Sequence, residues 1–137
     1  MQLGFNVMFG GNCREAVMFY AKALGLEEPQ FLTYGEGDTS FDTNVKNSSQ
    51  NDNNIMFSSL TIGTTDIIFN DMPDNFEFIK GNSFGITVLF ENANEAQKVF
   101  SNLSEGGMVF VPFAEVTGQG YYGMLGDKFD VSWTIKA

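Results

Sequence analysis

The chain has 137 residues, 43% of them hydrophobic, and seven Lys and Arg stand against seventeen Asp and Glu, a formal net charge of −10. This length supports one domain without disulfides, and the charge argues against nucleic acids and anionic membranes as partners, because both bind through Lys and Arg. The absence of histidine excludes Ser-His-Asp and Cys-His nucleophiles and every imidazole metal ligand.

The first elements expected are a strand and a helix. The apolar run Leu3–Phe9 is stopped by Gly10-Gly11-Asn12, which predicts a strand followed by a turn. Apolar residues then recur at helical spacing, which predicts a helix over Cys13–Leu24, with Asn12 as its side-chain cap and Gly25 in the left-handed position at its end.

Cys13 is the only cysteine, so an internal disulfide is excluded and a reducing, cytoplasmic compartment is expected. Its place at the first turn of the helix allows two interpretations. The helix dipole could lower the pKa of the thiol and make it reactive, or the residue could be a small, buried side chain between helix and sheet.

Three more strands complete the first half, at about 30–34, 55–62 and 66–70, and a tight turn at Gly63-Thr64 joins the last two. The segment 35–54 is rich in Gly, Asp, Asn, Ser and Thr and is expected to form a long mobile loop. Such a loop is either a lid over a site or an excursion without function.

The second half repeats the first. A strand at 85–90 precedes Asn92, which is again the expected cap of a helix that ends at Gly106-Gly107, and strands follow at about 108–113, 121–125 and 131–135. Glu15-Ala16 recurs as Glu95-Ala96, which indicates an internal duplication. We therefore expect an α+β fold with two βαβββ modules in one domain over 1–137: module 1 at about 1–71, a linker at about 72–83 and module 2 at about 84–137.

Two stretches carry a family resemblance. The helix start Phe9-Gly-Gly-Asn-Cys-Arg-Glu-Ala16 and the ending Asp127-Lys-Phe with Trp133-Thr-Ile135 resemble those of PhnB-like proteins in the glyoxalase/bleomycin-resistance/dioxygenase (vicinal oxygen chelate) superfamily. The resemblance implies a curved antiparallel sheet around a cleft, helices outside, and a homodimer. Many members of this branch carry a methyltransferase description, but the sequence shows no cofactor motif, so no cofactor is expected.

Enzymes of that superfamily hold a divalent metal through His and Glu side chains on the sheet. The resemblance places the corresponding positions near Phe5, at Phe57 and at Thr134. A phenyl ring has no lone pair to donate, and a single hydroxyl cannot hold a metal. We therefore expect no metal, and the missing ligands argue against an enzyme.

The resemblance and the alternation of the strands together indicate a ligand pocket. The candidates for its wall are Phe57, Ser59, Tyr121, Tyr122 and Thr134. Only one of the two tyrosines can line it, because strand neighbours point to opposite faces. Such a wall suits a small, largely apolar molecule. The net negative charge could attract a cationic ligand, or it could serve solubility alone.

Three functions remain open at this point. The first is binding of such a molecule without a metal. The second is a metal-dependent lyase, isomerase or dioxygenase with carboxylates from unusual positions, for which Glu115, expected in the loop after a strand, is a candidate base or ligand. The third is a degenerate homologue without a ligand, in which Phe rings fill the former metal cavity.

Overall fold

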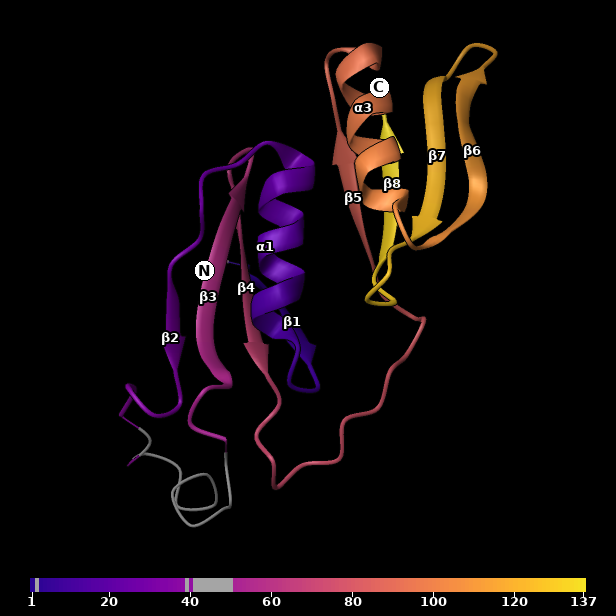
Figure 1. The fold of residues 1–137 in the computed structure, drawn as a ribbon. Coiled ribbons are helices and arrows are strands. Elements are labelled where there is room, and N and C mark those ends of the chain that lie inside the picture. Colours follow the sequence, from indigo (N-terminus) through magenta and orange to yellow (C-terminus); the bar gives the residue numbers. More distant parts are fainter. Residues whose placement is uncertain (2, 39, 41–50) are drawn as a thin grey trace. The chain divides into compact units, whose positions relative to one another are not determined.

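The computed structural model describes residues 1, 3–38, 40 and 51–137 (Figure 1). Residues 39 and 41–50, which belong to the expected mobile loop, lie outside the described residues. The chain divides into two compact units, residues 1–79 and 80–137, and this boundary falls inside the segment expected to be a linker. In the described part of the chain, no helix has the length and apolar character needed to cross a membrane.

The first unit contains one helix on a four-stranded sheet. Its elements are β1 (Phe5–Phe9), α1 (Cys13–Leu24), β2 (Phe31–Thr33), β3 (Ile55–Ile62) and β4 (Thr65–Asp71). The strand order is β1-β4-β3-β2, and α1 lies against β3 and β4 (Figure 1).

The second unit has the same arrangement. Its elements are β5 (Gly85–Leu89), α3 (Ala93–Ser104), β6 (Met108–Val116), β7 (Gly120–Gly126) and β8 (Ser132–Lys136). The strand order is β5-β8-β7-β6, and α3 lies against β6, β7 and β8. The expected α+β fold with two βαβββ modules is confirmed.

The resemblance implied an antiparallel sheet, but each of the two sheets contains one parallel pair of strands. β1 pairs with β4, and β5 with β8, in parallel, so each unit has a mixed sheet of its own. The reason is topological. Each of the elements α1, β2, β3 and β4 runs opposite to the element before it. Four reversals restore the original direction, so β4 runs parallel to its neighbour β1.

The observed limits of α1 and β3 are the expected ones, but β6 is longer than expected and runs to Val116. Glu115 therefore lies within a strand and not in the loop after it. β6 continues through Pro112 because it is an edge strand whose pairing with β7 is irregular between Val111 and Ala114. A missing N–H is tolerated at such a place.

The two helices begin differently. The Asn92 side chain accepts hydrogen bonds from the backbone N–H groups of Asn94 (2.8 Å) and Glu95 (3.2 Å), as expected. Asn12 makes no such bond, so the prediction for it was wrong. At α1 the carboxylate of Asp71 accepts from the N–H groups of Gly11 and Cys13, each at 2.9 Å, and thus serves as a cap from the end of β4.

This difference predicts unequal effects of two equivalent substitutions. Asn92→Ala should lower the free energy of unfolding by about 1 kcal/mol, because two backbone donors lose their acceptor. Asn12→Ala should change it by less than about 0.3 kcal/mol, since no cap bond is lost. Urea denaturation followed by circular dichroism measures both, and equal losses would show that Asn12 caps α1 in solution.

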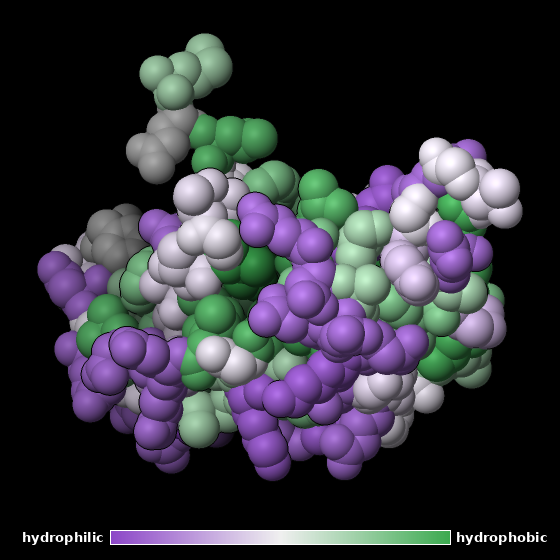
Figure 2. Space-filling view, turned by 90° about the horizontal axis from the view of Figure 1, so that it is seen from above, coloured by the Kyte–Doolittle hydropathy of each residue, from purple (hydrophilic) through white to green (hydrophobic). Residues whose placement is uncertain are grey.

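Each sheet buries one face under its helix. In the first unit the rings of Phe9, Tyr20 and Phe69 pack together with centroids 5.9–6.5 Å apart. In the second, Trp133 and Leu125 are buried against α3. Large hydrophobic side chains also reach the surface in both units. On the face drawn in Figure 2, green areas lie among purple ones.

Candidate functional site

The face of the first sheet opposite α1 carries two of the expected site residues. Along β3, Ser58 and Leu60 are buried, while Phe57, Ser59 and Thr61 are exposed. The Phe57 side chain is 45% exposed, a large fraction for an aromatic ring. The expected common face of these three residues is thus confirmed.

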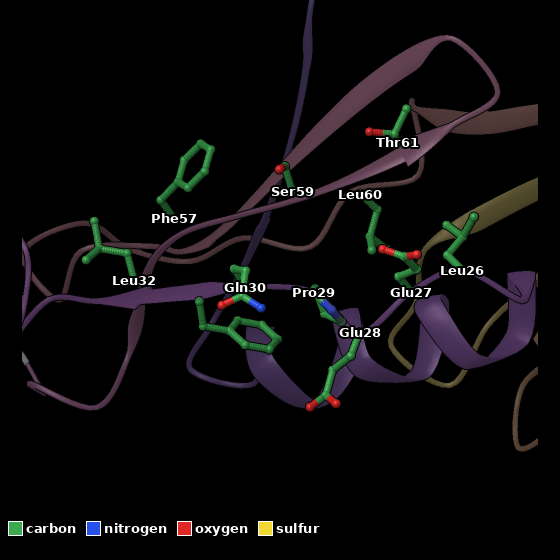
Figure 3. Close-up of a pocket in the computed structure, with 11 residues that line it drawn as sticks. Leu26, Glu27, Glu28, Pro29, Gln30, Leu32, Phe57, Ser59, Leu60 and Thr61 are labelled. Atoms are coloured by element: carbon green, nitrogen blue, oxygen red, sulfur yellow. The ribbon is translucent and has the colours of Figure 1, made fainter.

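A groove of about 480 Å³ opens beside this face. In Figure 3 it extends from Phe57 and Leu32 at one end to Thr61 and Leu26 at the other. One wall is β3 and the other is the segment that leads from α1 into β2. The lining residues are Leu26, Glu27, Glu28, Pro29, Gln30, Phe31, Leu32, Phe57, Ser59, Leu60 and Thr61.

Local sequence explains why the groove exists. β2 pairs with β3 only from Phe31, which lies opposite Ser58, and the Ser58 hydroxyl donates to the carbonyl of Gln30 at 2.8 Å. Continued pairing would set Pro29 opposite Leu60, but proline has no N–H to donate. The pairing of β2 with β3 therefore ends at Phe31. Beyond it, β3 faces the segment between α1 and β2 across the groove.

The groove is acidic. Among the described residues that line it, Glu27 and Glu28 carry carboxylates and none carries an amine or a guanidinium. Figure 3 shows Glu27 directed toward β3 and Glu28 directed away from it. At the rim, the Thr61 hydroxyl donates to the carboxylate of Asp66 at 2.6 Å.

Two further charged groups lie at β2. The guanidinium carbon of Arg14 is 4.5 Å from the centroid of the Phe31 ring, a cation–π contact. Glu36 accepts hydrogen bonds from the backbone N–H of Thr33 at 3.2 Å and from its hydroxyl at 2.9 Å, and these bonds lower the pKa of Glu36.

In the second unit the two expected tyrosines lie on opposite faces. The Tyr121 ring stacks on Phe113 (5.7 Å, 18°), whose ring contacts Phe100 of α3 at 5.7 Å. Tyr121 therefore belongs to the helix side. Tyr122 and Thr134 lie on the face that α3 leaves open and are partly exposed. Only Tyr122 of the pair can line a site on that face.

Glu115 pairs with Tyr121 across β6 and β7, so it shares the face of Tyr121 and not that of Tyr122 and Thr134. Its side chain is exposed. The burial that a carboxylate general base needs is therefore missing at this position.

Cys13 is buried, with none of its surface exposed. Burial, and to a smaller extent the charge of Asp71, raises the pKa of the thiol well above its ordinary value. The hypothesis of a reactive thiol activated by the helix dipole was wrong, and the alternative of a small buried residue is confirmed.

The residues present do not fit the metal that the superfamily implies. Phe5 pairs with Ile67, which is buried under α1, so Phe5 and Phe57 lie on opposite faces of the sheet. Within residues 1, 3–38, 40 and 51–137, no group of three or more His, Cys, Asp and Glu side chains is placed to hold a metal ion. We therefore derive no step that involves a metal.

Glu27 and Leu32 were missed by the sequence analysis. The signal that could have found them is the breaker Pro29 between a helix and a short strand. A segment that approaches a sheet edge without pairing leaves space beside the neighbouring strand, and its side chains line that space.

Comparison with known proteins shows the family to which the chain belongs. A model of the 3-demethylubiquinone-9 3-methyltransferase family matches residues 2–136. The chain belongs to this family. Protein YjdN of Escherichia coli (strain K12) is 28% identical over 142 residues, which covers 98% of this chain and 94% of YjdN.

Two solved structures share the fold of this chain. Protein PA1353 from Pseudomonas aeruginosa has 26% identity and a TM-score of 0.83, covering 99% of this chain and 96% of its own. A putative 3-demethylubiquinone-9 3-methyltransferase, PhnB protein, from Bacillus cereus has 20% identity and a TM-score of 0.74, covering 99% and 98%. A glyoxalase/bleomycin resistance protein/dioxygenase family enzyme from Burkholderia phytofirmans PsJN has the same fold, with 16% identity and a TM-score of 0.59, covering 95% of this chain and 92% of its own. The expected place among PhnB-like proteins is confirmed by the family model, and the glyoxalase-like fold by these structures.

Proposed function

We propose that this PhnB-like protein binds a small, largely apolar or cationic molecule without a metal, and that the groove beside β3 is the site. The observation that carries the proposal is the exposed ring of Phe57 next to the Ser59 hydroxyl in a groove of about 480 Å³. This volume lies within the range of small-molecule sites, which combine apolar walls with a few polar groups.

The energetics favour a ligand at this place. A phenyl ring in water is a source of binding free energy, because each Å² of apolar surface that a ligand covers contributes about 25 cal/mol. Leu32 lies next to Phe57 across the β2–β3 ladder and extends the apolar wall. Ser59 and Thr61 add hydroxyls that can orient the ligand. Tyr122 and Thr134, on the open face of the second unit, remain proposed ligand contacts.

A ligand titration of ¹⁵N-labelled protein tests the proposal. Small neutral and cationic aromatic compounds, added to millimolar concentration with EDTA present, should shift the amide signals of Phe57, Ser59 and Thr61. Phe57→Ser should abolish these shifts. Phe76→Ser is the matched control, because Phe76 is a similarly exposed ring (54%) that does not line the groove, and it should leave them unchanged.

Two results would contradict the proposal. Binding that EDTA removes, or a rise of several degrees in melting temperature with nickel, zinc, manganese or iron, would favour the metal-dependent enzyme. No shift with any compound at millimolar concentration would favour the homologue without a ligand.

We further propose that the protein is a cytoplasmic homodimer. A single, buried cysteine suits a reducing compartment. Met108 and Phe110 are 66% and 54% exposed on the edge strand β6, and an edge strand with exposed apolar side chains can pair with a second chain. Light scattering coupled to size-exclusion chromatography should give twice the 15.1 kDa of the chain, and the mass of a monomer would contradict the dimer.

A further inference from the structure

We infer that the groove beside β3 binds a short, extended peptide, which adds a strand to an open edge of β3. The inference rests on the proposed function, because it names the ligand class of the same groove: a peptide with apolar side chains and without carboxylates. Backbone hydrogen bonds to Ser59 and Thr61 hold this peptide, as in other proteins that bind a peptide by adding it to a sheet edge.

The half of β3 from Ser59 to Ile62 has a neighbouring strand on one side only. On that side β3 pairs with β4 up to Ile62, which lies opposite Thr65. On the other side β2 pairs with β3 only as far as Ser58. An unpaired edge of this kind is a template for a further strand. Because each residue of a strand extends over about 3.3 Å, the open edge is about 13 Å long and suits a peptide of about four residues.

The hairpin between β3 and β4 determines which backbone groups point to the open edge. Ile62 and Thr65 flank the two-residue turn, so they are a hydrogen-bonded pair of the ladder. Hydrogen-bonded and non-hydrogen-bonded pairs alternate, so Leu60 also bonds to β4, whereas Ser59 and Thr61 direct their N–H and C=O groups to the other edge. Within the described ranges, no backbone hydrogen bond reaches Ser59 or Thr61 from that edge. Both residues can therefore donate to and accept from a peptide.

The second unit has a strand in the corresponding position. By order along the chain, β6 and β7 correspond to β2 and β3. β6 pairs with β7 up to Gly126, which lies opposite Met108, and Val109 lies opposite Leu125. In the first unit the groove lies at this place, because β2 has only three residues where β6 has nine. The architecture of a unit thus accommodates an extended, apolar segment at this position.

Alternation along the peptide determines which side chains fit. A peptide residue that pairs with Ser59 or Thr61 places its side chain on the exposed face of the sheet, and the residue between them points to the opposite side. On that side Leu60 is directed toward the segment before β2, where Leu26 and Pro29 line the groove (Figure 3). An apolar side chain such as that of valine suits this position, since it covers apolar surface.

The charges at the groove argue against an acidic peptide. Glu27 and Glu28 line the groove, and the carboxylate of Asp66 accepts a hydrogen bond from Thr61 at its rim. Among the lining residues that the structure describes, none is basic. Like charges that meet in an interface disfavour a partner, so the groove is complementary to a peptide without carboxylates.

N-methylated peptides test the inference, because a methyl group removes one backbone donor and leaves the side chains unchanged. The probe is acetyl-Thr-Val-Thr-Val-amide, whose threonines are expected to pair with Ser59 and Thr61. In titrations of ¹⁵N-labelled protein it should shift the amide signals of both residues. Methylation of the nitrogen of its third residue should weaken binding about tenfold, because a hydrogen bond to β3 is lost and the methyl group meets the strand. Methylation of its second residue, whose N–H points away from β3, is the matched control and should change the affinity less than about twofold.

Two further measurements address the edge and the charge. The amides of Ser59 and Thr61 should exchange hydrogen rapidly in the free protein and about fivefold more slowly with saturating peptide, because pairing shields them from water. A carboxylate in place of the terminal amide of the peptide should weaken binding about twofold at low salt. Equal affinities of the two peptides would contradict the selection against carboxylates.

The outcomes separate this inference from the proposed function. Equal losses from the two methylations would overturn the inference, because binding would then not depend on strand pairing. Slow exchange at Ser59 and Thr61 in the free protein would also overturn it, since a second copy of the chain would already cover the edge. If aromatic compounds shift the signal of Phe57 and the peptide shifts none, the inference fails and the proposed function stands. If neither shifts any signal of the groove, both proposals fail.

Discussion

Replacing Asp71 with alanine is expected to lower the free energy of unfolding by about 4 kcal/mol. The side chain is buried, and its two oxygens accept three backbone N–H groups, those of Gly11 and Cys13 at 2.9 Å and that of Ile55 at 2.7 Å. Alanine leaves the buried N–H groups of Cys13 and Ile55 without a partner, and each such loss is expensive. Urea denaturation followed by circular dichroism measures the change.

Two companion variants make the result specific. Asp71→Asn keeps the size of the side chain but turns an NH₂ group toward at least one backbone donor, so it should still lower the free energy of unfolding by about 2 kcal/mol. Asp66→Ala removes a carboxylate from an exposed position of the same strand, and its effect should stay below about 0.5 kcal/mol. A similar loss for Asp66→Ala and Asp71→Ala would show that charge, and not the buried bonds, is responsible.

Asp71 matters to the proposed site because it joins segments that are far apart in the sequence. It binds the start of α1 and the first residue of β3, and its own carbonyl accepts the hydroxyl of Tyr34 at 2.9 Å. Ile55 is only two residues from Phe57, so the carboxylate fixes the strand that carries the exposed ring. The hydrogen bond to the Asp71 carbonyl also fixes Tyr34, which directly precedes the 35–54 segment.

The sequence predicted those features that depend on neighbouring residues. The helix Cys13–Leu24 and the strand Ile55–Ile62 were predicted with their observed bounds, because apolar spacing and terminal glycines act locally. The exposed face of Phe57 and Ser59 followed from alternation along β3. The cap of α1 could not be predicted in this way, since its acceptor, Asp71, lies 58 residues beyond Cys13.

The groove is lined by residues from two elements, β3 and β2 with the segment before it. The sequence predicted only the residues on β3. β3 supplied Phe57 and Ser59, which strand alternation identified. Glu27 and Leu32 became part of the wall only through the register of β2 against β3, in which pairing begins at Phe31 and leaves the segment before it unpaired beside β3. Register is a property of the pair of strands and cannot be predicted from the pattern of either strand alone.

Asp127→Ala is expected to lower the free energy of unfolding by about 3 kcal/mol. This second buried carboxylate accepts from the backbone N–H groups of Phe129 (2.8 Å) and Val131 (3.1 Å) and from the indole N–H of Trp133 (2.8 Å). It closes the turn between β7 and β8 and holds the largest buried side chain of its unit. Urea denaturation followed by Trp133 fluorescence measures the loss, because Trp133 is the only tryptophan.

A double-mutant cycle separates the indole bond from the turn. Trp133→Phe removes the N–H donor and keeps most of the packing, so its coupling to Asp127→Ala should be about 1.5 kcal/mol. Asp130→Asn is the matched control in the same turn. Asp130 is exposed, pairs with Lys80 and has a φ of 66°, a left-handed conformation that asparagine also adopts, so this change should be nearly neutral. Additive effects of the Asp127 and Trp133 substitutions would contradict the bond, since two residues that share a buried hydrogen bond cannot lose it twice.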